Sequence, residues 1–169
     1  FNPFKKTDLI YSFCNFCNKK SIFLYYHFLN DNKYSMSDSY NQSGLCFGCG
    51  SNHRNRIILK YFQNIYSGSD RSIYLPSGDG SLFNFLKKFK NSFFSDFYDD
   101  PKSYSTSAPH EDLTSLSFEK DTFDIVISEH VMEHVNDPKK AFYEIFRVLK
   151  NDGIYLFSIP FESSGQSLI

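Results

Sequence analysis

The chain of 169 residues has no tryptophan, only four cysteines and no long run of apolar residues. A helix needs roughly 18 consecutive apolar residues to span a membrane, so no membrane-spanning helix is expected. No secretory signal peptide is recognisable, and we therefore expect a cytoplasmic protein. The chain begins with Phe1 rather than Met. We therefore expect a processed or truncated product, and the interpretation that a leader sequence has been removed stays open.

A strong charge of one sign is also missing, because the formal net charge is -1. Residues 1–70 carry eight Lys and Arg against four Asp and Glu, whereas residues 71–169 carry ten against fifteen. Two halves of opposite charge indicate two modules with different partners. A balance of +4 in the first half is too weak to indicate nucleic-acid binding, so we expect no nucleic-acid partner.

All four cysteines fall into two Cys-x-x-Cys pairs, which are Cys14 with Cys17 and Cys46 with Cys49. Two thiolates three positions apart bind one metal ion from the same side, and two such turns complete the tetrahedral site that Zn²⁺ favours. Disulfides need an oxidising compartment, and a redox pair needs no second matching pair. The sequence therefore predicts a structural zinc site in a zinc-ribbon-like module over residues 10–56, with a polar insertion at 30–44.

Two arginines, Arg54 and Arg56, follow the second cysteine pair. Two interpretations stay open: a basic patch that binds phosphates, or a contact at the start of the next helix, and we favour the contact. A connecting helix and linker are expected over residues 57–70, because apolar residues there recur at helical spacing.

From residue 71 the sequence alternates between expected strands and expected helices. The strands are expected at 72–75, 92–96, 122–128 and 154–159, and a helix is expected to begin at Asp137-Pro138 and to stop at Gly153. Asp is a favoured N-cap, Pro a favoured first helical residue, and Gly a common stop signal. The order predicts an α/β fold over residues 71–169, with a doubly wound, mostly parallel, Rossmann-like sheet of about five strands.

Two short signals within this half indicate a nucleotide. Gly78 and Gly80 lie in the turn after the first strand, where glycine lets a ligand approach the backbone, although an ordinary turn explains them equally well. Asp96 ends the second strand, sixteen residues beyond Gly80. An acid at that position accepts hydrogen bonds from ribose hydroxyls in dinucleotide-type folds.

Four segments follow one another as 111–118, 123–127, 133–138 and 146–153. In this order they resemble the class I S-adenosylmethionine-dependent methyltransferases of the type 11 kind, and the cysteine pairs resemble a zinc-bearing subgroup. The resemblance covers most of residues 12–161. It implies an enzyme that transfers a methyl group from S-adenosylmethionine to a small-molecule or glycan acceptor.

The resemblance also implies roles for single residues around the cofactor. Gly78 and Gly80 would border its methionine part, and Asp96 would bind the ribose hydroxyls. Asp112, with Leu113 beside it, would contact the adenine.

Further along the chain, Glu129 and His130 would lie at the mouth where the methyl group is transferred. His130 or His134 is a candidate base, because an imidazole titrates near neutrality, although His134 is expected rather to cap or pack against the next helix. His130 and His134 also match the HxxEH pattern of zinc peptidases. That chemistry needs both histidines on one stable helix, and Pro138 leaves too little room for one.

The sequence departs from the family in two places. Leu75-Pro76-Ser77 replaces the usual acidic residue before the glycine turn. The family fold has seven strands, whereas this chain stops about ten residues after the last expected strand, at 154–159. We therefore expect a C-terminally truncated fragment, whose own activity stays open. The alternative hypothesis is a zinc-ribbon module that binds nucleic acid or protein, fused to an inactive Rossmann-like domain.

Overall fold

The computed structural model describes residues 4–30, 33–35, 44–66, 70–98 and 108–159. The chain divides into two compact units, one formed by Phe1–Ser67 with Asp79–Phe85 and the other by Gly68–Gly78 with Leu86–Ile169. The unit that carries the cysteines thus also takes in residues 79–85. The boundaries predicted from the sequence, 10–56, 57–70 and 71–169, stay predictions.

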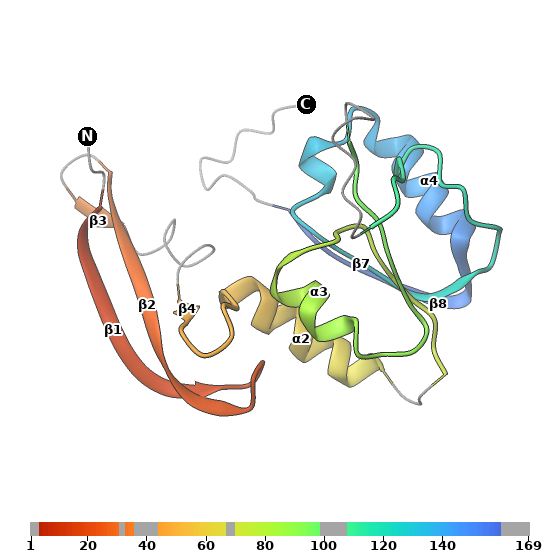
Figure 1. Cartoon of the computed structure of the whole chain (residues 1–169). Helices are drawn as coiled ribbons and strands as arrows, with labels where there is room; N and C mark the ends of the chain where they lie inside the picture. Colours follow the sequence, from red (N-terminus) through yellow and green to blue (C-terminus); the bar gives the residue numbers. More distant parts are fainter. Residues whose placement is uncertain (1–3, 31–32, 36–43, 67–69, 99–107, 160–169) are drawn as a thin grey trace. The chain divides into compact units, whose positions relative to one another are not determined.

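The first unit is built on a long antiparallel hairpin of β1 (Phe4–Cys14) and β2 (Lys19–Asn30), which Figure 1 shows in red and orange. Of the first cysteine pair, Cys14 ends β1 and Cys17 lies in the turn between the two strands. Two short strands, β3 (Lys33–Ser35) and β4 (Leu45–Cys46), also pair with β2. The polar insertion predicted at 30–44 falls mostly outside the described residues.

Helix α2 (His53–Ile65) follows the second cysteine pair. Asn52 caps it, since its side chain accepts from the Asn55 backbone N–H, and the Asn55 side chain accepts from the Asn52 N–H, both at 2.9 Å. This reciprocal pair satisfies two backbone donors and starts the helix four residues before Ile57. The buried face consists of Asn55, Arg56, Ile58, Leu59 and Phe62.

The helix that follows the glycine turn, α3 (Gly80–Leu86), is short, and all but its last residue belongs to the first unit. The ring of Phe85 lies 5.4 Å from that of Phe16 and 6.3 Å from that of Phe62, between ring centroids. The hydroxyl of Ser81, also on α3, donates to the Cys49 carbonyl oxygen at 3.4 Å.

The second unit contains a parallel sheet of four strands in the order β6-β5-β7-β8. The strands are β5 (Ile73–Leu75), β6 (Ser92–Phe94), β7 (Phe123–Glu129) and β8 (Leu149–Ser158). All of β5 and most of β7 are buried, as expected for the centre of a parallel sheet. The predicted α/β, Rossmann-like sheet is therefore confirmed, with four strands in the described residues rather than about five.

The strand order creates a switch point at the carboxyl edge of this sheet. The chain runs from β5 to β6 on one side and then returns to β7 on the other side of β5. The crossovers diverge there and leave a crevice beyond the strand ends, which is where open α/β sheets bind ligands.

Helix α4 (Pro138–Val148) connects β7 to β8 (Figure 1) and begins where the sequence predicts. The Asp137 carboxylate accepts from the Lys140 N–H at 3.0 Å, and Pro138 occupies the first helical turn. Ala141, Ile145 and Val148 are buried in a core cluster that they share with β5 and β7.

The predicted helix stop at Gly153 is wrong, because α4 ends at Val148 and Gly153 lies inside β8. The strand starts at once because Leu149 pairs with Phe123, while the next pair joins Ile154 to Ile125. Between these two pairs β8 has more residues than β7, and in this irregularity Gly153 comes close to the Lys150 backbone. A Cβ there would lie 2.9 Å from the Lys150 carbonyl oxygen.

Within the described residues, no helix is long and apolar enough to span a membrane.

Asp124 joins three segments of the second unit. Its carboxylate accepts from the Ser72 N–H at 2.8 Å, from the Ser72 hydroxyl at 2.7 Å and from the Lys150 ammonium at 2.7 Å. Burial alone would raise the pKa of Asp124, but the hydrogen bonds from Lys150 and Ser72 outweigh it and lower that pKa to about 2.

We expect Asp124→Asn to lower the free energy of unfolding by about 1–2 kcal/mol at neutral pH. The folded-state pKa is depressed, so this contribution is present above about pH 4 and disappears as the pH falls towards 2. In urea unfolding measured from pH 4 down to pH 2, the difference in the free energy of unfolding between Asp124→Asn and wild type should shrink as the pH falls. An equal difference at every pH would contradict the assignment, and Asp121→Asn serves as the exposed control.

Candidate cofactor and metal sites

A cavity of about 550 Å³ lies in the second unit at the carboxyl edge of the sheet. Its wall includes Pro76 after β5, Ser95 after β6 and Val131 after β7. The volume falls in the range of small-molecule pockets, roughly 300–1,000 Å³. The cavity thus occupies the place where the strand order predicts a ligand.

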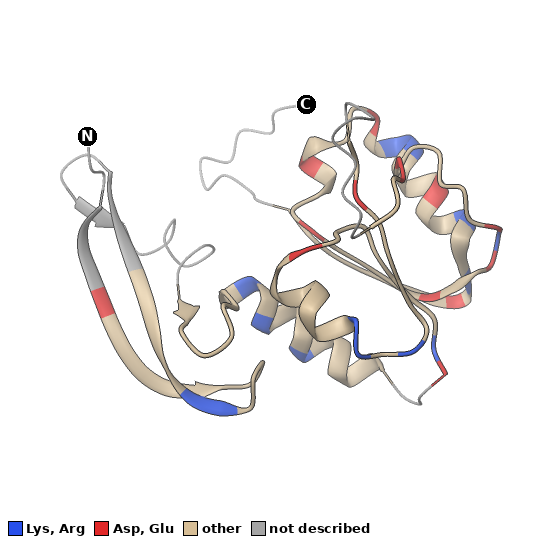
Figure 2. Ribbon diagram, in the orientation of Figure 1, with Lys and Arg blue, Asp and Glu red and all other residues tan. Residues whose placement is uncertain are grey.

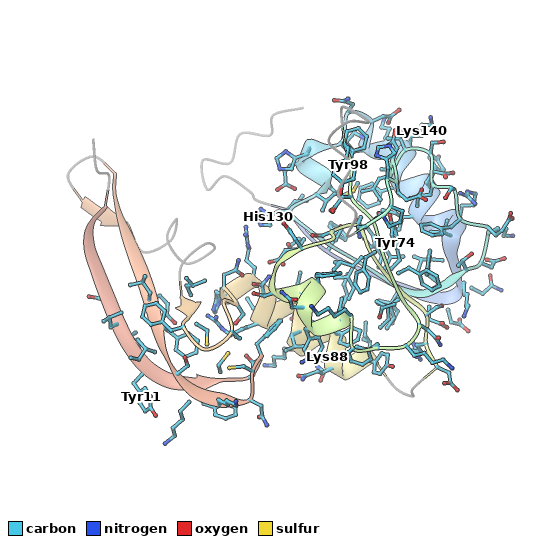
Figure 3. All side chains as sticks on the ribbon, viewed as in Figure 1. Tyr11, Tyr74, Lys88, Tyr98, His130 and Lys140 are labelled. Carbon is cyan, nitrogen blue, oxygen red and sulfur yellow. The ribbon has the colours of Figure 1, made fainter. Side chains whose placement is uncertain are left out.

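Asp96, the predicted ribose ligand, closes the glycine turn. Its Oδ1 accepts from the Gly78 N–H at 2.8 Å, and its Oδ2 accepts from the Tyr98 hydroxyl at 3.2 Å. Tyr98, labelled in Figure 3, is itself placed by its backbone N–H, which donates to His110 Nδ1 at 3.2 Å. The structure therefore brings two predicted site residues, Gly78 and Asp96, into direct contact.

Gly78 has no room for a side chain. A Cβ at this position would lie 2.4 Å from Asp96 Oδ2 and 2.6 Å from Ala108 Cβ. The Asp96 carboxylate can therefore meet the backbone of the turn only if residue 78 is glycine.

We expect Gly78→Ala to displace Asp96 and to destabilise the protein by about 1–3 kcal/mol, as overpacking does. Urea unfolding measures the loss, and Ser77→Ala in the same turn is the control because it adds no atoms. A Gly78→Ala protein as stable as this control would contradict the close contact.

The predicted adenine contacts, Asp112 and Leu113, line the cavity, whereas Gly78 and Asp96 are not among its lining residues. Asp112 Oδ1 accepts from the Thr114 N–H at 2.7 Å and from the Thr114 hydroxyl at 2.9 Å, which fixes a tight turn. Leu113 is 6% exposed and belongs both to the core cluster and to the cavity wall. The wall formed by Leu113 is thus apolar and continuous with the core, and the carboxylate of Asp112 lies beside it.

Gly80, the second predicted glycine, lies in the first unit at the start of α3 with a φ of +79°. No atom of the described residues lies within 4 Å of a Cβ added there, so a glycine at this position serves the backbone conformation and not close packing.

The predicted catalytic residues lie at the end of β7. Glu129 ends that strand, and His130, labelled in Figure 3, has a φ of +54°, which is uncommon for a residue with a side chain. Its Nδ1 lies 3.1 Å from Glu133 Oε1, and its backbone N–H donates to the Ser158 carbonyl oxygen at 3.0 Å. His134 lines the cavity.

The peptidase alternative finds no support in this segment. Met132–His134 form a single 3-10 turn, so His130 and His134 do not share a helix. Among the described residues, the only group of three or more potential ligands close enough to hold a metal ion is the set of four cysteines.

The four predicted metal ligands lie together in the first unit. Their sulfur atoms all lie within 4.8 Å of one another, with 3.9 Å between those of Cys14 and Cys49 and 4.0 Å between those of Cys17 and Cys46. Tetrahedral zinc with Zn–S bonds of about 2.3 Å requires S–S separations of roughly 3.8 Å. The arrangement therefore fits a Zn²⁺ ion with four sulfur ligands.

The cysteines do not share one electrostatic environment. Burial, followed by hydrogen bonds with neighbouring thiols, raises the pKa of Cys17 to about 12. Burial also acts to raise the pKa of Cys46, but hydrogen bonds from the Ser21 hydroxyl and the Gly48 backbone lower it to about 7. Cys46 therefore supplies a thiolate to a metal ion more readily than Cys17, because the thiolate is the ligand.

Arg54 and Arg56 lie at the start of α2, where the sequence allows either a phosphate-binding patch or a structural contact. Figure 2 shows basic residues and no acidic ones on α2, which could suit a phosphate site. Arg56, however, is only 9% exposed, and its Nη1 donates to the Ser51 carbonyl oxygen at 2.8 Å. For Arg56, burial and this hydrogen bond therefore favour a contact at the start of the helix over a phosphate-binding patch.

Three side chains that contact these sites were not predicted from the sequence: Ser51 beside the sulfur atoms, and Tyr98 and His110 beside Asp96. Ser51 directly follows the second cysteine pair, which is a usable signal for a residue close to the metal. Tyr98 lies two residues after Asp96, which is also a usable local signal. For His110 there is no such signal, because its contact with Tyr98 joins residues twelve apart.

Residues 85–157 match the family model described as a methyltransferase domain. The resemblance seen in the sequence is thereby confirmed for this part of the chain. No curated protein sequence matches the chain.

Solved structures are similar to the chain at low identity. The YcgJ protein of Bacillus subtilis is 18% identical with a TM-score of 0.50, over 63% of this chain and 50% of that one. A candidate methyltransferase of Bacillus halodurans is 20% identical with a TM-score of 0.49, over 59% and 49% of the two chains.

A further match is a chain from the Haloferax volcanii complex of the Trm112 methyltransferase activator with a candidate methyltransferase. It is 20% identical with a TM-score of 0.46, over 63% of this chain and 53% of that one. The chain thus spans about half the length of these structures. The similarity to YcgJ confirms the Rossmann-like fold and nothing more specific.

Proposed function

We propose that this chain is part of an S-adenosylmethionine-dependent methyltransferase, which binds the cofactor in the cavity of the second unit. The observation that carries the proposal is the contact between Asp96 and the Gly78 backbone at the switch point of the sheet. An acid and a glycine turn at this place suit a ribose whose neighbouring groups approach the backbone. The match of residues 85–157 to a methyltransferase domain supports the choice of cofactor.

S-adenosylmethionine would supply an activated methyl group, and the work of the protein is positioning it. The Asp96 carboxylate, whose oxygens are held by the Gly78 N–H and the Tyr98 hydroxyl, would accept hydrogen bonds from the ribose hydroxyls. Asp112 would offer a polar contact and Leu113 an apolar contact to the adenine. Gly78 would border the methionine part.

The acceptor side of the reaction is assigned to the end of β7. His130 accepts a proton from a hydroxyl or amine acceptor, and Glu133 orients the imidazole through Nδ1 at 3.1 Å. The left-handed backbone of His130 agrees with this role, because uncommon backbone conformations cluster at functional sites. The acceptor class is a small molecule or a glycan, and Glu129 lies at the mouth of the site.

We also propose that Cys14, Cys17, Cys46 and Cys49 hold one structural Zn²⁺ ion. Four protein ligands leave no open position for a substrate, so its work is to keep the first unit folded. The nucleic-acid alternative is not favoured, since Arg56 is buried.

Isothermal titration of the full chain with S-adenosylhomocysteine tests the cofactor assignment. We expect saturable binding of one molecule per chain and at least tenfold weaker binding of ATP, because the acidic residues Glu111, Asp112 and Asp137 that line the cavity repel a triphosphate. Absence of binding at millimolar S-adenosylhomocysteine, or equal affinity for ATP, would contradict the proposal.

A further inference from the structure

Arg56 on α2 is a buried cation in the unit that carries the cysteines. Its Cζ atom lies 4.8 Å from the centroid of the Phe23 ring, and Phe23 belongs to the same small core cluster as Cys14 and Cys46. None of the ion pairs between described residues includes Arg56. A buried charge without a counter-charge is strongly unfavourable, so another feature must compensate it.

Ser51 connects this guanidinium to the sulfur atoms. The side chain of Ser51 is fully buried, and its hydroxyl oxygen lies 3.1 Å from Cys49 Sγ and 3.7 Å from Cys14 Sγ. Its carbonyl oxygen accepts from Arg56 Nη1 at 2.8 Å and from the Cys46 N–H at 2.9 Å. One residue therefore contacts three of the four cysteines and the guanidinium.

The space around the guanidinium is also restricted. A Cβ added to Gly44, which has a φ of +73°, would lie 2.9 Å from Arg56 Nη2 and 3.0 Å from Tyr25 Cε1. Gly44, Tyr25 and Phe23 thus surround a planar group that hydrogen bonds to the second cysteine turn. The arginine is held in one place and is not a mobile surface side chain.

Charge gives a reason for this arrangement. Four thiolates on one Zn²⁺ ion carry a net charge of roughly -2, and such a centre needs positive groups nearby when it is shielded from water. Helix α2 starts at His53, four residues after Cys49, and its N-terminal end carries a partial positive charge. Arg56 adds a full positive charge one turn further along the same helix.

We propose that Arg56 is the counter-charge of the metal–thiolate centre and a positioning residue for the metal, acting through Ser51. The inference rests on the proposed zinc centre. Bound metal and buried guanidinium then stabilise each other, which explains why an arginine is buried at this position.

Zinc affinity of the full chain, measured by competition with a chromophoric chelator, tests this role. We expect Arg56→Met to raise the dissociation constant of zinc about 10- to 100-fold, the size seen for residues that support metal ligands. Arg56→Lys, which keeps the charge, should restore most of the affinity. The matched control is Lys60→Gln, an exposed cation on the same helix, with an effect of about twofold or less.

Lost packing against Phe23 could also weaken the site, and a double-mutant cycle separates the two causes. Cys17→His changes the centre to three thiolates and one neutral imidazole, which reduces its net negative charge from roughly -2 to roughly -1. If Arg56 acts by charge, Arg56→Met should cost several-fold less affinity in this background. Cobalt absorption reports the ligand set of each variant.

An unchanged zinc affinity in Arg56→Met, or the same loss in both backgrounds, would overturn the counter-charge role. A wild-type chain that binds no zinc would instead refute the metal centre itself, and with it this inference. Binding of S-adenosylhomocysteine is measured separately, so a failure there concerns the cofactor site alone.

Discussion

Replacing Cys46 by serine is expected to abolish zinc binding and to unfold the region around the two cysteine turns. Cys46 is fully buried, and its thiol has the lowest of the cysteine pKa values that are shifted. Among the described residues, the core cluster around the sulfur atoms has three buried members, Cys14, Phe23 and Cys46. So small a core cannot compensate for a structural zinc ion, whose binding contributes roughly 10–16 kcal/mol to folding.

Metal content and amide hydrogen exchange measure this outcome together. Zinc should fall from one ion per chain to none, and the amides of residues 19–24 and 45–50 should lose protection. The amides of β7 serve as an internal reference, because they belong to the other unit. Ser12→Ala, an exposed change on β1, is the matched control. Retention of one zinc ion with unchanged protection would disprove the four-cysteine site.

Asp96→Asn is expected to weaken binding of S-adenosylhomocysteine roughly 10- to 100-fold, the value of one or two hydrogen bonds to a charged acceptor. The amide oxygen of Asn can still accept from the Gly78 N–H, so the turn should keep its shape. What is lost is the negative charge that the ribose hydroxyls are proposed to meet.

Isothermal titration measures this loss, and urea unfolding shows whether the fold is retained. Asp121→Asn is the matched control, because Asp121 is an exposed acid of the same unit and its φ of +57° suits Asn. Equal affinity in Asp96→Asn and Asp121→Asn would remove Asp96 from the cofactor site. Tyr98→Phe should give an intermediate loss, since it removes only one bond to the carboxylate.

Local chemistry explains which parts of this fold were predictable. The start of α4 was predictable because Asp137 and Pro138 act within one turn of the chain. The two cysteine turns were predictable because ligand spacing is itself local. The sheet followed from the alternation of apolar runs, which requires no knowledge of the strand order.

The features that the sequence did not reveal come from contacts between distant residues. Gly153 carries a stop signal, but pairing of Leu149 with Phe123 ends the helix earlier and draws Gly153 into a strand. The burial of Arg56 depends on Phe23 from the hairpin, and the place of Tyr98 depends on His110. Helix α3 shows the same effect, since its aromatic partners Phe16 and Phe62 come from before the linker.

The membership of α3 in the first unit has a consequence for how such a protein can be divided or exchanged. The chain leaves the sheet after Gly78, passes through α3, and returns at Leu86. The two units are therefore interlaced along the sequence, and no single cut separates them. A hybrid joined at Asp70 would separate Phe85 from Phe16 and Phe62, so a functional exchange between relatives would have to transfer α3 together with the cysteine-bearing part.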